Sequence, residues 1–232
     1  MQFSDFNLNN PLINALNDLG FTEATTIQEK AFPVIMSGRD IVGIAQTGTG
    51  KTIAYLLPCL RLWKYTVEKH PQILIVVPTR ELVVQVTEEI KKMTTYMNIR
   101  VAGVYGGENM IRQAPLILEG LDILVATPGR LLDFALNGTL KLRLVKRFVI
   151  DEVDEMLNLG FRPQLIRIMD LLPRKRQNLM FSATMTTEIK DFIADFFIDP
   201  QEIEAARTGT PLANIKQIGI KVPNYNTKIN LL

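Results

Sequence analysis

A glycine-rich stretch between an apolar run and a helix-compatible run constrains this fold more than any other feature. It reads Ala45-Gln46-Thr47-Gly48-Thr49-Gly50-Lys51-Thr52 and lies between the runs at 41–44 and 52–57. Strand, glycine-rich turn and helix, in this order, are the context of a phosphate-binding P-loop. The usual pattern begins with glycine, whereas this chain has Ala45 there. An ordinary glycine-rich turn is the alternative, and the flanking runs favour the phosphate site.

The residue types of this stretch suit phosphate and metal binding. Gly48 and Gly50 allow the backbone to curl, so that successive N–H groups point at phosphate oxygens. The N-terminus of the following helix adds its dipole and its unpaired N–H groups. Lys51 would supply a mobile positive charge for the β- and γ-phosphates, and the Thr52 hydroxyl suits Mg²⁺.

Composition sets broad limits on the class of protein. The 232 residues are 47% hydrophobic and 22% charged, which indicates a globular chain with a sizeable core. The net charge of +2 neither demands nor excludes nucleic acid. Cys59 and His70 are the only residues of their types, which argues against disulfides, a cysteine-rich metal site and a histidine base. We expect Cys59 in the core and His70, in a polar turn, in solvent.

The N-terminus suggests no export signal. Residues 1–6 lack the basic start and apolar centre of a signal peptide, and no apolar stretch reaches the length of a membrane span. We therefore expect a cytoplasmic protein that does not contact a membrane.

Short apolar runs alternate with helical patterns along the chain. Strands are predicted at 41–44, 73–77, 100–105, 123–126, 148–150, 178–181 and 202–205. Helices are predicted between them, including one that Pro58 can kink and a short one at 110–118. This alternation predicts an α/β fold with a mostly parallel sheet and helices on both faces. Ligands bind beyond the carboxyl ends of such strands.

Two neighbouring carboxylates follow the predicted strand at 148–150. Asp151 and Glu152 stand where the Mg²⁺ of a bound nucleotide would lie. One carboxylate can hold the ion, directly or through water, and the other can orient an attacking water. Solvated acids at a strand end are the alternative. The P-loop earlier in the chain favours the metal site.

Several segments together resemble the DEAD-box RNA helicase family, specifically its N-terminal RecA-like, P-loop lobe. The segments that carry the resemblance are Phe3, Gly20-Phe21 with Ile27-Gln28, 45–52, Pro78-Thr79-Arg80-Glu81-Leu82, Gly106-Gly107, Thr127-Pro128-Gly129-Arg130, Asp151-Glu152-Val153-Asp154 and Ser182-Ala183-Thr184. The family's form of the P-loop begins with alanine, which accounts for Ala45. Val153 departs from the family's alanine, and Ala24 and Thr26 replace prolines often seen beside the first motif.

The resemblance implies a role for each segment. Phe3, Phe21, Gln28 and residues 45–52 would bind ATP, with Gln28 reading adenine and Phe3 stacking on it. Lys51, Asp151, Glu152, Asp154, Ser182 and Thr184 would be the catalytic set, with Mg²⁺ held by Thr52 and Asp151. RNA would be bound through its backbone, independently of sequence, by Pro78, Thr79, Arg80, Gly106, Gly107, Thr127, Pro128, Gly129 and Arg130. For Arg80 and Arg130, capping or surface pairing is the alternative.

The resemblance also implies a division of the chain. Residues 1–206 would form the ATP-binding domain, and 207–232 a linker and the start of a truncated second RecA-like domain. The full-length protein would be an RNA-dependent ATPase and helicase with possible protein partners, and this lobe alone would be poorly active. An ATP-gated RNA clamp and an unrelated P-loop ATPase remain as alternatives. The adenine-reading segment and the 127–130 segment argue against the latter.

Overall fold

Seven strands form a parallel sheet in the computed structural model, which describes residues 1–205, 220–222 and 229. The strands are β1 (Ile41–Ile44), β2 (Ile73–Val76), β3 (Val101–Val104), β4 (Ile123–Ala126), β5 (Arg147–Ile150), β6 (Gln177–Ser182) and β7 (Gln201–Glu204). Their order across the sheet is β3-β4-β2-β5-β6-β1-β7, and every pair is parallel. The predicted α/β class with a mostly parallel sheet is confirmed.

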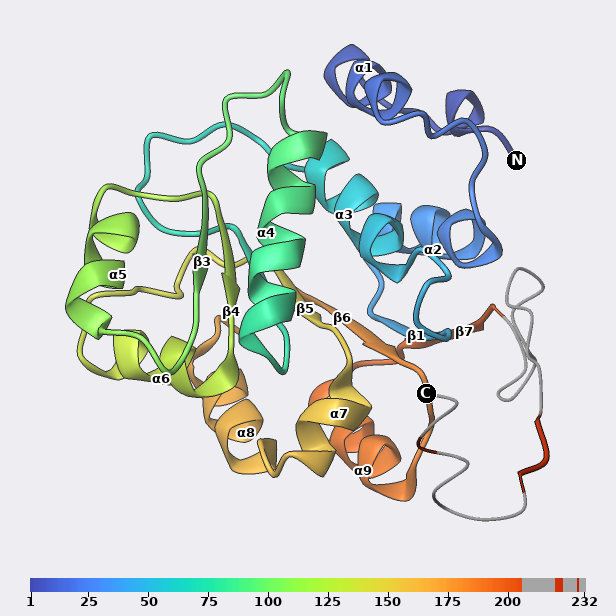
Figure 1. The fold of residues 1–232 in the computed structure, drawn as a ribbon. Helices are drawn as coiled ribbons and strands as arrows, with labels where there is room; N and C mark the ends of the chain where they lie inside the picture. The colour runs from blue at the N-terminus through green and yellow to red at the C-terminus, as the bar shows by residue number, and fades with distance from the viewer. Residues whose placement is uncertain (206–219, 223–228, 230–232) are drawn as a thin grey trace.

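Helices cover both faces of this sheet (Figure 1). They are η1 (Phe3–Asp5), α1 (Asn10–Asp18), α2 (Thr26–Met36), α3 (Lys51–Arg61), α4 (Arg80–Met93), α5 (Met110–Leu118), α6 (Pro128–Leu136), α7 (Val153–Asn158), α8 (Arg162–Leu171) and α9 (Thr187–Phe196). The first four α-helices pack on one cluster of buried side chains, and α5 to α9 pack on a second. The two clusters lie on opposite faces of the sheet, because successive strand residues point in opposite directions.

The strand β2 shows why its sequence is apolar without a break. Ile73 and Ile75 belong to the first cluster, and Leu74 and Val76 belong to the second. All four side chains are fully buried. A central strand covered on both faces has no position left for a polar residue.

Most expected elements are found within one or two residues of their predicted bounds, and the helix at Met110–Leu118 is found as predicted. The helix α3 runs through Pro58 to Arg61, so the proline does not end it. Cys59 is buried, as expected. The expectation for His70 is wrong, because its side chain is partly buried and burial lowers its pKa. The segment at 207–232, predicted to be a linker and the start of a second domain, lies outside the described residues except for 220–222 and 229.

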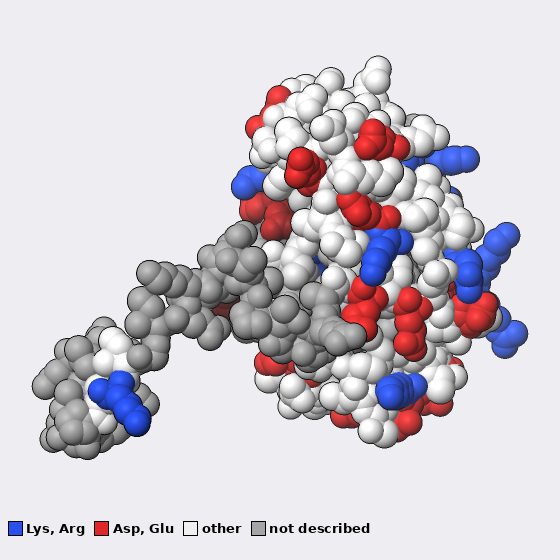
Figure 2. All heavy atoms as spheres, turned by 90° about the vertical axis from the view of Figure 1, so that its right-hand side faces the viewer, with Lys and Arg blue, Asp and Glu red and all other residues white. Residues whose placement is uncertain are grey.

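Surface charge and helix length add two observations. On the face shown in Figure 2, Lys and Arg side chains alternate with Asp and Glu among the residues drawn in colour. Within the described residues, each helix is too short or too polar to cross a membrane.

Candidate functional site

The predicted functional segments lie at one edge of the sheet. The P-loop follows β1, the 78–80 segment follows β2, Gly106-Gly107 follows β3, the 127–130 segment follows β4, Asp151 follows β5 and Ala183 follows β6. All of these strands run in the same direction, so their carboxyl ends meet at this edge. The structure thereby brings together segments that are up to 139 positions apart in the chain, from residue 45 to residue 184.

The P-loop is a tight turn between β1 and α3. Gly48 and Gly50 have φ angles of 80° and 88°, in the left-handed region that glycine adopts most easily. A Cβ atom on Gly50 would lie only 2.4 Å from Nε2 of Gln28. Ala45 is buried at the start of the loop, where its N–H donates to the carbonyl of Ser182 over 2.9 Å. An alanine therefore fits this first position without entering the cleft described below.

Lys51 is the feature of the loop that most needs a ligand. It is the first residue of α3, and only 6% of its surface is exposed. Its ammonium nitrogen is buried and has no hydrogen-bond partner among the described residues. A buried cation without a partner is costly. An anion bound against the glycine turn and the N-terminus of α3 would provide one.

Gln28 connects the N-terminal segment to the P-loop. It lies in the first turn of α2, where its Oε1 accepts from the N–H of Thr25 over 2.8 Å. Its Nε2 donates to the carbonyl of Gly50 over 3.1 Å. A carboxamide oxygen can accept twice and its nitrogen can donate twice. One acceptor and one donor of Gln28 therefore remain for a ligand.

A cleft of about 730 Å³ opens at this point. The predicted nucleotide-site residues that line it are Phe3, Phe21, Gln28, Thr47, Gly48, Gly50, Lys51, Thr52, Asp151 and Glu152. Ala45, Gln46 and Thr49 do not line it, and Thr49 instead donates its hydroxyl to the carbonyl of Gln46. Phe3 packs against Phe6 and is 5% exposed, whereas Phe21 is 39% exposed. Phe21 therefore offers more ring surface to a ligand than Phe3 does.

The first acidic residue lies at the floor of the cleft. Asp151 is buried, and burial raises the pKa of its carboxyl to about 6 against the opposing positive charge of Lys51. Its Oδ1 accepts from the N–H of Glu152 over 3.0 Å. Nearby Tyr55 is fully buried and its hydroxyl has no hydrogen-bond partner among the described residues. Burial and then the charge of Asp151 raise the pKa of this tyrosine.

Glu152 has an uncommon backbone conformation. Its φ of 56° and ψ of 49° are left-handed, and it precedes the first residue of α7. Such a conformation costs a non-glycine residue about 1–2 kcal/mol. Strain of this kind often marks functional sites. The next residue, Val153, is fully buried in the second cluster, so the larger side chain at this position is part of the core.

Asp154 joins the end of β5 to the end of β6. Its Oδ2 accepts from the N–H groups of Ala183 and Thr184, over 3.2 and 3.1 Å, and from the Thr184 hydroxyl over 3.1 Å. The Ser182 hydroxyl also accepts from the N–H of Thr184, over 3.3 Å. These three side chains do not line the cleft. They bind two loops of the site to each other.

The predicted RNA-binding segments form a second group beside the cleft. Arg80, Gly106 and Gly107 are exposed, whereas Pro78, Thr127, Pro128 and Arg130 are buried and Thr79 and Gly129 are intermediate. The Thr79 hydroxyl accepts from the N–H of Leu82 and caps α4. The Thr127 hydroxyl accepts from the N–H of Gly106 over 3.3 Å. Exposed and buried members of the group thus differ in their contacts.

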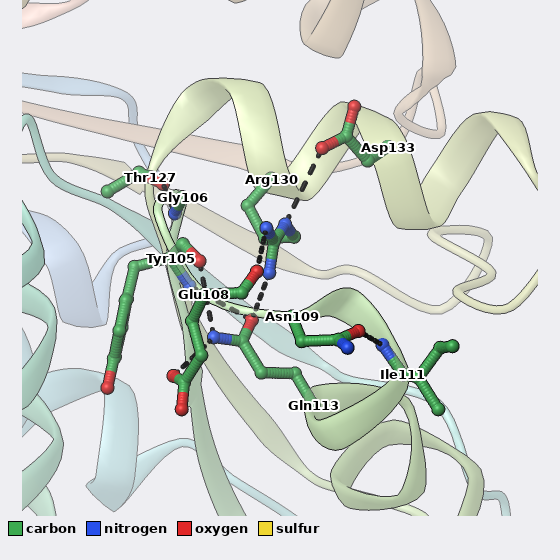
Figure 3. Close-up of polar contacts among 9 residues, drawn as sticks. All are labelled: Tyr105, Gly106, Glu108, Asn109, Ile111, Gln113, Thr127, Arg130 and Asp133. Carbon is green, nitrogen blue, oxygen red and sulfur yellow. Dashed lines mark hydrogen bonds and ion pairs between the residues drawn. The ribbon is translucent and has the colours of Figure 1, made fainter.

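Arg130 turns inward and makes contacts inside the protein (Figure 3), whereas the sequence left capping or surface pairing as the alternative to RNA binding. Its guanidinium donates to Oε1 of Gln113 over 2.8 Å and to the carbonyl of Glu108 over 2.7 Å. Its Nε lies 3.5 Å from the carboxylate of Asp133. Arg80 has no such pairing within the part of the chain that the structure describes, and its guanidinium lies over the ring of Tyr105, 4.8 Å from the centroid.

Sequence reasoning missed Gln113 and Tyr55. Both are polar residues at positions of a helix that face the core. Gln113 lies four positions before the buried Ile117, on the same face of α5. A polar residue on an otherwise buried face was the available signal, since such a group needs a partner.

The parallel sheet and the glycine turn around the buried Lys51 define a P-loop nucleotide-binding domain of the α/β class. The DEAD/DEAH box helicase family model matches residues 25–192, and the chain belongs to this family. The family resemblance read from the sequence is therefore confirmed.

Individual relatives agree with this assignment. The chain is 41% identical, over 95% of its length, to the ATP-dependent RNA helicase CshA of Listeria monocytogenes, and it covers 42% of that protein. It is 41% identical to the ATP-dependent RNA helicase DeaD of Escherichia coli, over 93% of this chain and 34% of that protein. A crystal structure of a DEAD box protein from Methanococcus jannaschii matches 89% of this chain and 56% of that one, with a TM-score of 0.84 and 36% identity. The chain spans less than half the length of these two curated relatives.

Proposed function

We propose that this chain is the ATP-binding N-terminal lobe of an ATP-dependent RNA helicase. The full-length protein would couple ATP hydrolysis to RNA binding and local duplex unwinding in the cytoplasm. The observation that carries the nucleotide site is the buried ammonium of Lys51 inside the glycine turn, for which the described residues provide no hydrogen-bond partner. The carboxylates of Asp151 and Glu152 line the same cleft.

In this proposal the cleft holds ATP along its length. The N–H groups of the P-loop and the Lys51 ammonium bind the phosphates. Gln28 reads adenine with its remaining donor and acceptor, which are both needed because adenine presents a donor beside an acceptor. Phe21, and to a smaller extent Phe3, stack on the base.

The residues present also fit a magnesium ion. Mg²⁺ is usually held by one or two side chains together with phosphates and water. Thr52 and Asp151 line the cleft and would hold the ion, partly through water. The ion would neutralise charge on the phosphates. Glu152, fixed by its left-handed backbone, orients the hydrolytic water.

RNA binds beside the cleft in this proposal. The exposed Arg80 and the backbone N–H group of the exposed Gly107 suit phosphates of any sequence. The contacts of Asp154 with Thr184 couple this edge to the nucleotide site. A second RecA-like lobe of the full-length chain supplies further arginines, which can be worth about 10³–10⁵ in phosphoryl transfer. The isolated lobe therefore hydrolyses ATP poorly.

Calorimetric titration with ADP and with GDP, both with Mg²⁺, tests the nucleotide site. We expect binding of ADP in preference to GDP, and we expect Gln28→Ala to remove that preference. Equal binding of both nucleotides by the unmodified chain would contradict adenine reading by Gln28. Stimulation of the full-length ATPase by RNA but not by DNA would support the helicase, and equal stimulation would favour a different P-loop motor.

A further inference from the structure

Gln113 is a buried glutamine that uses all of its hydrogen-bonding capacity (Figure 3). Only 3% of its surface is exposed. Its Oε1 accepts from Arg130 over 2.8 Å and from the N–H of Tyr105 over 3.3 Å. Its Nε2 donates to the carbonyl of Tyr105 over 3.2 Å and to the carboxylate of Glu108 over 3.0 Å. Two acceptor sites and two donor hydrogens are thus filled.

The partners of Gln113 belong to the segments of the proposed RNA surface. Tyr105 precedes the Gly106-Gly107 loop, and Glu108 follows it. Arg130 comes from the segment after β4 and also donates to the carbonyl of Glu108. The glycine loop is therefore held on both sides by one side chain of α5 and by the arginine that this side chain binds.

The same contacts reach the 78–80 segment. The guanidinium of Arg80 lies over the ring of Tyr105, whose backbone Gln113 fixes. Gln113 also favours the charged form of Glu108, because its hydrogen bond is the main cause that lowers the pKa of this carboxyl. Arg80 and Arg112 lower it further. Gln113 thus holds an ionised carboxylate in place beside a surface meant for phosphates.

We propose that Gln113 is a positioning residue for RNA binding, which holds Arg130, Tyr105 and Glu108 so that the Gly106-Gly107 loop and Arg80 present a preformed surface to the RNA backbone. The inference rests on the proposed function. Gln113 does not touch RNA in this scheme, because it is buried. It acts by fixing the loop before RNA binds, which reduces the ordering cost of binding.

Only an amide satisfies all four partners. Leucine has about the same volume as glutamine. It would leave the Arg130 guanidinium, the Glu108 carboxylate and two backbone groups of Tyr105 without their hydrogen bonds to residue 113. Glutamate would keep both acceptor contacts and lose both donors, and it would place a second carboxylate beside Glu108. The two substitutions therefore separate the acceptor contacts from the donor contacts.

The test uses the full-length protein, a short single-stranded RNA and a non-hydrolysable ATP analogue. We expect Gln113→Leu to weaken RNA binding by about tenfold or more, since hydrogen bonds to charged groups are lost. ADP affinity should stay within about twofold, because Gln113 does not line the nucleotide cleft. Gln113→Glu should weaken RNA binding and keep the protein folded even if Gln113→Leu does not fold.

Gln177→Leu is the matched control. Gln177 is buried to a similar degree, and its Nε2 donates to the carbonyls of Ile35 and Arg39. It lies at the start of β6, at the edge of the sheet opposite the site. Its loss should lower the melting temperature and leave RNA affinity unchanged.

A double-mutant cycle separates positioning from a general loss of stability. If Gln113 acts through Arg130, the effects of Gln113→Leu and Arg130→Ala on RNA affinity are not additive. Three results would each overturn the inference. The folded Gln113 variants could bind RNA within about twofold of the parent, or the effects of the two substitutions on RNA affinity could be additive. Gln177→Leu could also lose as much RNA affinity as the Gln113 variants do. A parent protein that binds no RNA would instead overturn the proposed function.

Discussion

Gly50→Ala is the substitution whose cost can be worked most directly from the structure. Gly50 has a φ of 88°, and a Cβ atom there would lie 2.4 Å from Nε2 of Gln28. Alanine would therefore meet two penalties at once. The backbone would be held in a left-handed conformation, and the Gln28 side chain would be displaced from its bond to the Gly50 carbonyl.

The two penalties have known sizes. The left-handed conformation costs a non-glycine residue about 1–2 kcal/mol. Lower entropy of the unfolded chain offsets about 0.4–1 kcal/mol of this. Displacing Gln28 and losing its hydrogen bond adds about 2 kcal/mol. The net loss in the free energy of unfolding is therefore about 3 kcal/mol, of which the contact with Gln28 accounts for most.

Gly38→Ala is the control for the backbone term. Gly38 has a φ of 85°, and a Cβ atom there would have no neighbour within 4 Å among the residues that the structure describes. Urea unfolding should show a loss of about 1 kcal/mol for this variant, from the left-handed conformation alone. The melting temperature of Gly50→Ala should lie about 4–8 °C below that of Gly38→Ala. ADP affinity should fall only in Gly50→Ala.

The Gln28→Ala background completes the test. Without the Gln28 amide, Gly50→Ala should cost only about as much as Gly38→Ala. Equal losses for the two glycine variants in the parent chain would refute the argument. So would a loss in Gly50→Ala that does not change when Gln28 is removed.

Three further predictions concern the cleft. Lys51→Ala should lose ADP affinity and the thermal stabilisation by ADP, and equal binding of ADP by this variant and the parent would contradict the P-loop assignment. Glu152→Gln should keep ATP binding and abolish hydrolysis by the full-length protein. Folding raises the pKa of Asp151 from 3.8 to about 6, so the folded state binds the proton more tightly. The stability from this group is therefore present below pH ~4 and is lost as pH rises through about 6, by up to roughly 3 kcal/mol. In buffer free of Mg²⁺, urea unfolding of Asp151→Asn should lack this fall, and an unchanged pH dependence would contradict it.

The sequence by itself determined the class of fold and the edge at which the site lies. Continuous apolar runs such as that at 73–76, alternating with helical patterns, indicate parallel strands that are buried on both faces. Residues that follow such strands must meet at one edge, so the positions of Lys51 and Asp151 followed from topology. The motif spacing then carried the family resemblance that the comparisons confirmed.

Only the tertiary structure decided how the polar side chains are partnered. The sequence placed Arg130 at the edge where the carboxyl ends of the strands meet, but it did not show that this side chain turns inward to Gln113, 17 positions away. It likewise did not show that Gln28 donates to the carbonyl of Gly50, 22 positions away, or that the Lys51 ammonium has no hydrogen-bond partner among the residues that the structure describes. Hydrophobic periodicity is a local property, so it can be read directly from neighbouring residues in the sequence. The partner of a polar group depends instead on which distant segments the fold brings within about 3 Å.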